Sequence, residues 1–255
     1  MGFFAHFGRL WLRDGFPLAT QVCRADCIGH HFPFGAAAPA HSVEGTPACP
    51  HPLPPMKAPI EGLLLDLGGV LYGVDYLRTI KELGLSPQDL PALLQDPTLA
   101  LYEKGLISTE AFLAAWQKRF PHLSSQALVQ AWNAMLLGPL PDAEKLLQAL
   151  AAQYPLALLS NTNDLHLTVV EPQISSWKPY FVEWFFSNRL HRRKPDPDTY
   201  RFAVERLGWD PHKTLFVDDS PLNLQGAQAA GLQTYHLTPP NQPLQLQAFL
   251  QKSYL

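Results

Sequence analysis

The sequence predicts an α/β fold, in which a parallel sheet lies between two layers of helices and a small helical domain is inserted after the first strand. Three observations support this prediction. Short apolar runs alternate with helical patterns between residues 60 and 237, which is typical of parallel sheets covered on both faces. The stretch 75–137 has helical patterns and no convincing strand. Three apolar runs end directly on polar residues, as central strands do beside a binding crevice.

The first strand is expected within 60–67, and a helix over 142–153 begins at an acidic residue that can act as its cap. The further elements are expected at 155–160 (strand), 163–176 (helix), 181–186 (apolar run), 197–208 (helix), 214–219 (strand), 221–230 (helix) and 232–237 (short strand). We therefore expect the core to comprise 58–74 and 138–255, and the helical domain to span 75–137.

The composition limits the possible partners and the compartment. The 255 residues are 47% hydrophobic, which is enough for one or two domains with real cores. A net charge of -3 gives no basic surface, so nucleic acid is a poor candidate partner. No apolar run is long enough to span a membrane. All three cysteines precede residue 57, and a chain without cysteines beyond that point suits the cytoplasm. We expect a monomer or a homodimer.

The first 57 residues are rich in proline and show no persistent helical or strand period. We expect this segment to be disordered or to be an over-long translation, with Met56 as the true start. A targeting peptide is the alternative, but the apolar first 20 residues lack a clean hydrophobic core followed by a small-residue cleavage site. Cys23, Cys27 and His30 could hold zinc, although their spacing is not that of a standard pair of ligand pairs.

Polar residues stand at the ends of three predicted strands. Asp66 follows "LLL", Ser160-Asn161 ends "PLALL", and Asp218-Asp219 ends "TLFV". Because the carboxyl ends of parallel strands meet at one edge of a sheet, we expect these side chains to converge. Three converging carboxylates repel one another, and a hard cation relieves that repulsion; an oxygen-only ligand set favours Mg²⁺.

Lys194, in "HRRKPDPDTY", precedes the helix expected at 197–208. Its positive charge, together with a hydroxyl at Ser160 and the amides that follow the strands, suits the oxygens of a phosphoryl group. Asp66 could then attack phosphorus and form an acyl phosphate. Each feature alone has an ordinary explanation: an Asp after a strand is usually a turn or helix cap, and Asp218-Asp219 could merely cap the helix at 221–230.

Taken in order, these residues resemble the haloacid dehalogenase (HAD) superfamily of hydrolases over residues 60–237. The first motif of that superfamily, Asp-x-Asp-x-Thr/Val, is similar to "DLGGV" at 66–70 except that Gly68 replaces the second Asp. Ser160, Lys194 and Asp218-Asp219 are similar to its other three motifs. The resemblance implies a Rossmann-like core, and the stretch 75–137 resembles a small helical cap.

The resemblance also implies roles. Asp66 would be the nucleophile and a magnesium ligand. The other magnesium ligands would be the carbonyl of Gly68, the carboxylate of Asp219, and Asp218 either directly or through water.

The phosphate would be held by Ser160 and the amide of Asn161, with Lys194 bridging phosphate and Asp66. Asn223 could anchor the loop after Asp219.

Gly68 cannot perform the acid–base step that the second Asp performs in the usual mechanism, and such a group is typically worth about 10²–10⁴-fold in rate. Asp75 is the nearest candidate replacement, and the alternative is that it caps a helix starting at Tyr76. His166 is a second candidate, and the favoured alternative is a solvent-facing helix residue.

The sequence therefore predicts a magnesium-dependent phosphatase that hydrolyses a small phosphorylated metabolite through an aspartyl phosphate. "DLGGVLYGVD" and "LLSNTNDLH" resemble a branch that includes glucose-1-phosphate phosphatases, which makes a sugar phosphate one candidate substrate. A catalytically impaired binding or regulatory protein is the alternative, and a dehalogenase or a phosphoacceptor receiver domain fits less well. Aromatic residues of the cap could stack on a substrate, but at helical spacing such residues more often form the core; they are Tyr72, Tyr102, Trp116 and Trp132.

Overall fold

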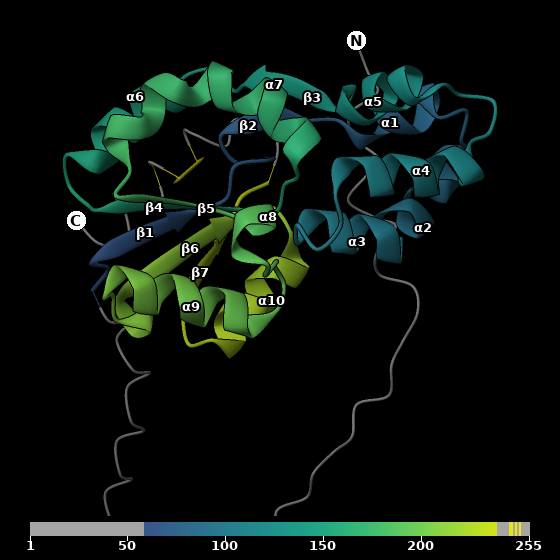
Figure 1. The fold of residues 1–255 in the computed structure, drawn as a ribbon. Helices are drawn as coiled ribbons and strands as arrows, with labels where there is room; N and C mark the ends of the chain where they lie inside the picture. Colours follow the sequence, from purple (N-terminus) through teal and green to yellow (C-terminus); the bar gives the residue numbers. More distant parts are fainter. Residues whose placement is uncertain (1–58, 239–244, 247, 249, 251–255) are drawn as a thin grey trace, which may run out of the picture. The chain divides into compact units, whose positions relative to one another are not determined.

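The computed structural model describes residues 59–238, 245, 246, 248 and 250. In this part of the chain a five-stranded parallel sheet forms the centre, and helices cover both of its faces (Figure 1). A group of helices is inserted between β2 (Tyr72–Val74) and β3 (Leu136–Pro139). The predicted fold class is confirmed.

The strand order of the sheet is β5-β4-β1-β6-β7. The bounds are β1 Gly62–Leu65, β4 Leu156–Ser160, β5 Glu183–Phe186, β6 Thr214–Asp218 and β7 Gln233–His236. The chain builds outward from β1 to β4 and β5, then returns to the other side of β1 with β6 and β7. The strand order therefore reverses at β1, and binding sites of open parallel sheets lie at the carboxyl ends of strands at such a point.

Alternating side chains of the central strand divide the core into two layers. Leu63 and Leu65 pack with α6 (Ala143–Ala151) and α7 (Asp164–Ile174). Leu64 points the other way and packs with α9 (Pro197–Leu207) and α10 (Pro221–Ala229). Because the side chains of a strand alternate between its faces, a continuous apolar run needs cover on both sides. Shorter helices complete this part: η2 (Ser175–Tyr180), α8 (Ser187–Leu190) and η3 (Pro211–Lys213).

We call the helices between β2 and β3 the helical insert. They are α1 (Tyr76–Glu82), η1 (Pro87–Asp89), α2 (Leu90–Leu94), α3 (Pro97–Glu103), α4 (Thr109–Arg119) and α5 (Ser125–Asn133). Their apolar side chains form a separate hydrophobic cluster. At its centre the Phe112 ring stacks on Tyr102 at 4.3 Å and lies 4.6 Å from Trp116.

The four aromatic residues considered for stacking on a substrate are buried. Tyr72, Tyr102, Trp116 and Trp132 are each at most 1% exposed. The alternative that they belong to the core is confirmed, so they have no free face for a ligand.

A two-stranded antiparallel ribbon joins the insert to the core. It consists of β2 (Tyr72–Val74) and β3 (Leu136–Pro139). The prediction that 75–137 contains no strand is wrong at its end, because β3 begins at Leu136. A strand this short shows no measurable alternation, and its partner lies far away in the chain. Gly138 has a φ of 105°, which favours glycine and gave no strand signal in the sequence.

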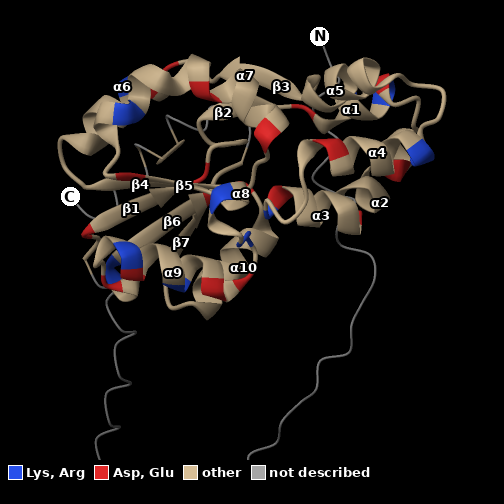
Figure 2. Ribbon diagram, viewed as in Figure 1, with Lys and Arg blue, Asp and Glu red and all other residues tan. Residues whose placement is uncertain are grey.

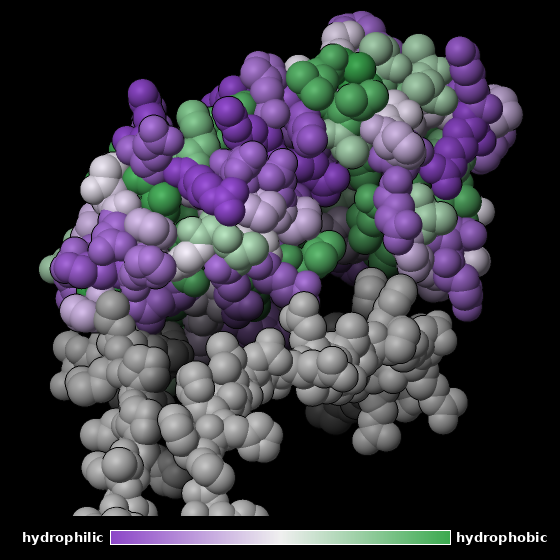
Figure 3. Space-filling view, turned by 90° about the horizontal axis from the view of Figure 1, so that it is seen from below, coloured by the Kyte–Doolittle hydropathy of each residue, from purple (hydrophilic) through white to green (hydrophobic). Residues whose placement is uncertain are grey.

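The described surface mixes polar and apolar side chains (Figure 3). Large exposed apolar residues are spread along the chain, and they include Leu106, Leu137, Val182 and Leu222. Among the described helices none is both long and apolar enough to cross a membrane. The predictions for residues 1–57, including the start at Met56 and the zinc ligands, lie outside the described residues.

Candidate active site

The three predicted carboxylates lie together at the carboxyl end of the sheet. Asp66 follows β1, Asp218 ends β6, and Asp219 is the next residue. One oxygen atom from each lies within 4.8 Å of the others. We call this group the acidic cluster. Asp66 is 7% and Asp218 0% exposed, and Asp219 is the least buried of the three.

Lys194 lies inside this cluster. Its Nζ is 2.7 Å from Asp66 Oδ1 and 2.7 Å from Asp218 Oδ2, and its side chain is 1% exposed. Burial disfavours the ammonium charge, but the carboxylates of Asp218 and Asp66 outweigh burial and raise the pKa of Lys194. The lysine is therefore a fixed positive charge next to the expected nucleophile.

The charges of the acidic cluster are not balanced by the protein. Burial raises the pKa of Asp66 well above its usual value; Lys194 opposes this effect, while Asp218 and Asp219 reinforce it. Burial and the neighbouring Asp218 raise the pKa of Asp219 to about 6. Three carboxylates against one lysine leave a deficit that a divalent cation would offset, and an oxygen-only donor set suits Mg²⁺. The residues present therefore fit a magnesium ion.

A tight loop positions Asp66. Its Oδ1 accepts a hydrogen bond of 2.7 Å from the amide of Leu67, and the amide of Gly69 donates to the carbonyl of Tyr72 at 2.9 Å. Gly69 has a φ of 73°, and a Cβ built on it would lie 2.1 Å from Asp219 Oδ2. Glycine is therefore needed here both for the backbone conformation and for the close approach of Asp219.

Gly68 stands where the second Asp is expected, and the structure gives this position little room. A Cβ built on Gly68 would lie 3.2 Å from Cγ2 of Val74 in β2. A Cβ at 68 therefore requires the Val74 side chain to move by a few tenths of an ångström.

The predicted phosphate-binding residues, Ser160 and Asn161, stand at the carboxyl end of β4. Ser160 ends β4 and is 4% exposed, and its hydroxyl makes no hydrogen bond to another described residue. Asn161 has a role that the sequence did not indicate. Its Nδ2 donates to the carbonyl of Lys194 and its Oδ1 accepts from the amide of Lys194, both at 2.9 Å. Asn161 thus fixes the backbone from which the Lys194 side chain extends.

Asn223 and Ser220 hold Asp218. The Asn223 amide nitrogen lies 3.0 Å and 3.1 Å from the two carboxylate oxygens of Asp218, and the amide of Ser220 donates to Asp218 Oδ1 at 2.8 Å. Asn223 was predicted to anchor this loop, and in the structure it contacts Asp218. With both its oxygens bonded, Asp218 is fixed in orientation.

Asp75 caps α1. Its Oδ1 accepts a hydrogen bond of 3.0 Å from the amide of Leu77, and its Oδ2 lies 3.6 Å from Arg78 Nε. The cap that we gave as the alternative for Asp75 is therefore confirmed. Its acid–base role stays a prediction.

His166 is not solvent-facing, so that expectation is wrong. It is 9% exposed, and its ring stacks on Trp132 with the ring centres 4.8 Å apart. Burial lowers the pKa of His166 to about 4. The residue faces the insert because α5 packs on α7, a tertiary contact that the local pattern could not show.

The insert also brings residues to the site that sequence reasoning missed. Tyr76 at the start of α1 is 42% exposed, yet the surrounding protein atoms, Glu103 of α3 and the acidic cluster raise the pKa of its phenol. Glu103 lies 3.0 Å from Arg193, the residue before Lys194. The position of Arg193 beside Lys194 was visible in the sequence, but its partner in the insert was not.

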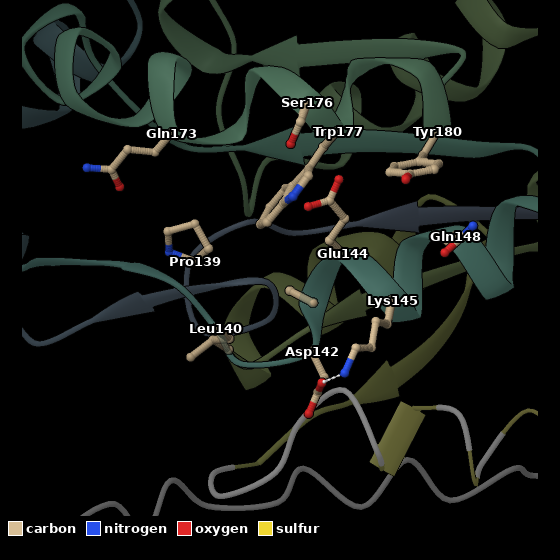
Figure 4. A pocket seen from close by; sticks show the side chains of 11 residues that line it. Pro139, Leu140, Asp142, Glu144, Lys145, Gln148, Gln173, Ser176, Trp177 and Tyr180 are labelled. Atoms are coloured by element: carbon tan, nitrogen blue, oxygen red, sulfur yellow. Dashed lines mark hydrogen bonds and ion pairs between the residues drawn. The ribbon is translucent and has the colours of Figure 1, made fainter.

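A cavity of about 500 Å³ lies elsewhere, between α6 and η2 (Figure 4). Trp177, Tyr180 and Glu144 are among its lining residues, and none of the predicted site residues lines it. The candidate site is therefore the strand-end cluster and not this cavity.

The family model that matches residues 60–231 describes a haloacid dehalogenase-like hydrolase. This match covers more than half of the chain. The chain belongs to this family.

Three known proteins are similar in sequence to this haloacid dehalogenase-like hydrolase. A HAD family enzyme from Bacteroides thetaiotaomicron, solved in complex with magnesium and inorganic phosphate, is 32% identical; the match covers 70% of this chain and 94% of that one, with a TM-score of 0.62. Hexitol phosphatase A from Escherichia coli K12 is 26% identical over 67% of this chain and 80% of its own length. (S)-2-haloacid dehalogenase 4A from Burkholderia cepacia is 33% identical over 42% of this chain. The chain spans 30% and 46% of the lengths of the first two curated relatives that it matches.

Gly69→Ala should disrupt the acidic cluster of this hydrolase, because the added methyl group meets Asp219. We expect the variant to lose magnesium-induced thermal stabilisation and to lose hydrolysis. Gly84→Ala is the matched control, since Gly84 has a φ of 70° but nothing closer to an added Cβ than 3.9 Å. It should be destabilised by about 1 kcal/mol from backbone strain alone and should still respond to magnesium. An equal magnesium response in both alanine variants would contradict the assigned position of Asp219.

His166 should make the stability of the fold depend on pH. The folded pKa of about 4 lies below the value of 6.5 for a free imidazole, so the unfolded chain binds more protons between these pH values. The free energy of unfolding should fall by up to about 3 kcal/mol as the pH falls from 6.5 to 4. Urea titrations of His166→Phe should lack this part of the slope, whereas the exposed control His122→Phe should retain it. A full slope in His166→Phe would assign the effect to other groups.

Proposed function

We propose that this hydrolase is a magnesium-dependent phosphatase that hydrolyses small phosphate monoesters through an aspartyl phosphate on Asp66. The observation that carries the proposal is the acidic cluster with Lys194 buried inside it. A nucleophilic carboxylate, a fixed cation and a cation-binding set of oxygens are the parts that phosphoryl transfer requires.

Two displacements at phosphorus complete the reaction. An oxygen of Asp66 attacks phosphorus, the bond from phosphorus to the ester oxygen breaks, and the leaving oxygen takes a proton. Water then attacks phosphorus, loses a proton, and breaks the bond to Asp66, which releases phosphate and restores the carboxylate.

The chain's own residues position the phosphate and limit its charge. Lys194 offsets charge on the phosphoryl oxygens, and the Ser160 hydroxyl and the Asn161 amide donate hydrogen bonds to them. Asp66, the Gly68 carbonyl, Asp218 and Asp219 would hold Mg²⁺, which when bound neutralises phosphoryl charge and orients the group.

Two observations favour phosphorus over carbon as the point of attack. Displacement of halide from carbon does not call for a metal, and it would not require both Asp218 and Asp219 beside Asp66. The unbalanced negative charge of the acidic cluster would therefore have no role in displacement of halide from carbon. The match to a haloacid dehalogenase nevertheless makes halide release a necessary arm of the test.

Phosphate release from a panel of esters tests the proposal. The panel contains sugar 1-phosphates, sugar 6-phosphates and an aryl phosphate, each with magnesium and with chelator, and 2-haloacids are assayed for halide. We expect magnesium-dependent phosphate release and no halide. Halide release without phosphate release would assign the dehalogenase reaction. Neither product would assign a catalytically impaired binding or regulatory protein, with Gly68 as the lesion.

Asp75→Asn tests whether Asp75 replaces the acid–base group that Gly68 lacks. We expect turnover to fall at least tenfold, which is the low end for loss of a positioned acid–base group. The melting temperature should stay near that of the wild type, because Asn caps a helix about as well as Asp.

Asp96→Asn is the control for this variant. Asp96 also caps a helix of the insert, through the amide of Thr98, and also pairs with an arginine, Arg119. If Asp75→Asn, Asp96→Asn and the wild type had equal turnover, Asp75 would have no role in the mechanism.

A further inference from the structure

The end of α3 is fixed to the core segment that leads to Lys194. Glu103 Oε2 lies 3.0 Å from Arg193 Nη2, and His191 Nδ1 lies 2.9 Å from the carbonyl of Lys104. A Cβ built on Gly105 would lie 2.0 Å from the carbonyl oxygen of Asn188. Acidic and basic ribbon segments lie next to each other where α3 approaches α8 (Figure 2). Three consecutive residues of the insert thus contact residues 188–193, immediately before the catalytic lysine.

Glu103 also acts on the site itself. Burial raises the pKa of Glu103, while the charges of Arg193 and Lys194 oppose this effect. The negative charges of Glu103 and of the acidic cluster both contribute to the raised pKa of Tyr76. Because Glu103 pairs with Arg193, the neighbour of Lys194, it lies on the insert side of the catalytic group. Since the phosphoryl group must lie on Asp66 and Lys194, the insert side is where the leaving group lies.

The positive charges of Arg193 and Lys194 are already paired with carboxylates. The side chains of Glu103 and Arg193 are only 15% and 26% exposed, so their charges interact strongly. Lys194 likewise forms ion pairs with the carboxylates of Asp66 and Asp218. Arg193 and Lys194, the two cations that act on Glu103, are thus both paired with carboxylates, so neither is free for an anionic leaving group.

We propose that Glu103 is a specificity-determining residue, which selects phosphate esters with an uncharged, hydroxyl-bearing leaving group against esters that carry a carboxylate. This inference rests on the proposed phosphatase function. The carboxylate of Glu103 and the hydroxyl of Tyr76 accept hydrogen bonds from substrate hydroxyls. A substrate carboxylate would face the carboxylate of Glu103 with no free guanidinium beside it, because Arg193 is held by Glu103.

Two pairs of esters that differ in one carboxylate test the inference. They are 2-hydroxyethyl phosphate against 2-phosphoglycolate, and glucose 6-phosphate against 6-phosphogluconate. We expect the wild type to have a higher kcat/KM for the uncharged member of each pair. Glu103→Gln removes the negative charge and frees Arg193. It should shift the ratio of kcat/KM values at least about tenfold towards the carboxylated member, mainly through KM.

Glu171→Gln is the matched control, because Glu171 pairs with Arg189 at 2.9 Å within the core. It should leave the ratio unchanged. If Glu103 only tethers the insert, Glu103→Gln will lower kcat/KM for both members equally, and that outcome overturns the inference. A wild-type preference for the carboxylated esters overturns it as well. Absence of phosphate release from every ester would instead reject the proposed function on which the inference rests.

Discussion

Asp66→Asn is expected to lower turnover by about 10⁴-fold or more without weakening the fold. An amide cannot attack phosphorus, and loss of a catalytic nucleophile removes nearly all of the covalent pathway. Burial raises the pKa of Asp66, which means that its charge opposes folding when no cation is bound. With chelator present, the melting temperature of the variant should therefore equal or exceed that of the wild type. Phosphate release and thermal unfolding measure the two effects.

Asp210→Asn provides the comparison. Asp210 caps η3 through the amide of His212 and stands before the amino end of β6, at the opposite end of that strand from Asp218. Its replacement should leave turnover within a factor of about two. Substantial turnover in Asp66→Asn would show that another group attacks phosphorus.

Lys194→Met should have the largest effect on stability. The substitution keeps the length of the side chain but removes the cation between Asp66 and Asp218, which are both buried. Breaking a buried ion pair by removing one partner typically costs about 3–5 kcal/mol, because the remaining charge is left uncompensated. We expect a loss of this size in the free energy of unfolding measured in urea with chelator, together with loss of turnover.

Magnesium and a surface lysine give the controls for this experiment. Magnesium should raise the melting temperature of Lys194→Met by more than that of the wild type, because the variant has more unbalanced charge for the ion to offset. Lys213→Met removes an exposed pair with Glu61 and should cost less than about 1 kcal/mol. If Lys194→Met were as stable as Lys213→Met, the buried lysine would not be holding the two carboxylates together.

The sequence predicted the sheet because its strands are continuous apolar runs. The run Leu63-Leu64-Leu65 has no alternation, and only a strand that is covered on both faces can bury all three side chains. The same reasoning placed Asp66 and Asp218 at strand ends on one edge. Those two positions follow from local pattern and topology alone.

Contacts between distant segments could not be read from the sequence. β3 pairs with β2, although the whole helical insert separates them in the chain. The side chain of Asn161 binds the backbone of Lys194, whereas only the backbone amide of Asn161 had a predicted role. The burial of His166 depends on the packing of α5 against α7. Glu103 belongs to an ordinary helical pattern until the fold brings it to Arg193. Each of these depends on how elements pack, which a local pattern does not encode.

The stereochemistry at phosphorus tests the central claim most directly. The wild-type protein is given a phosphorothioate monoester made chiral at phosphorus with two oxygen isotopes, in water that carries the third isotope and with magnesium, and the configuration of the released thiophosphate is determined. Attack by Asp66 followed by attack by water inverts phosphorus twice, so we predict release of thiophosphate with net retention. Net inversion would show that water attacks the ester directly, and it would contradict an aspartyl phosphate on Asp66.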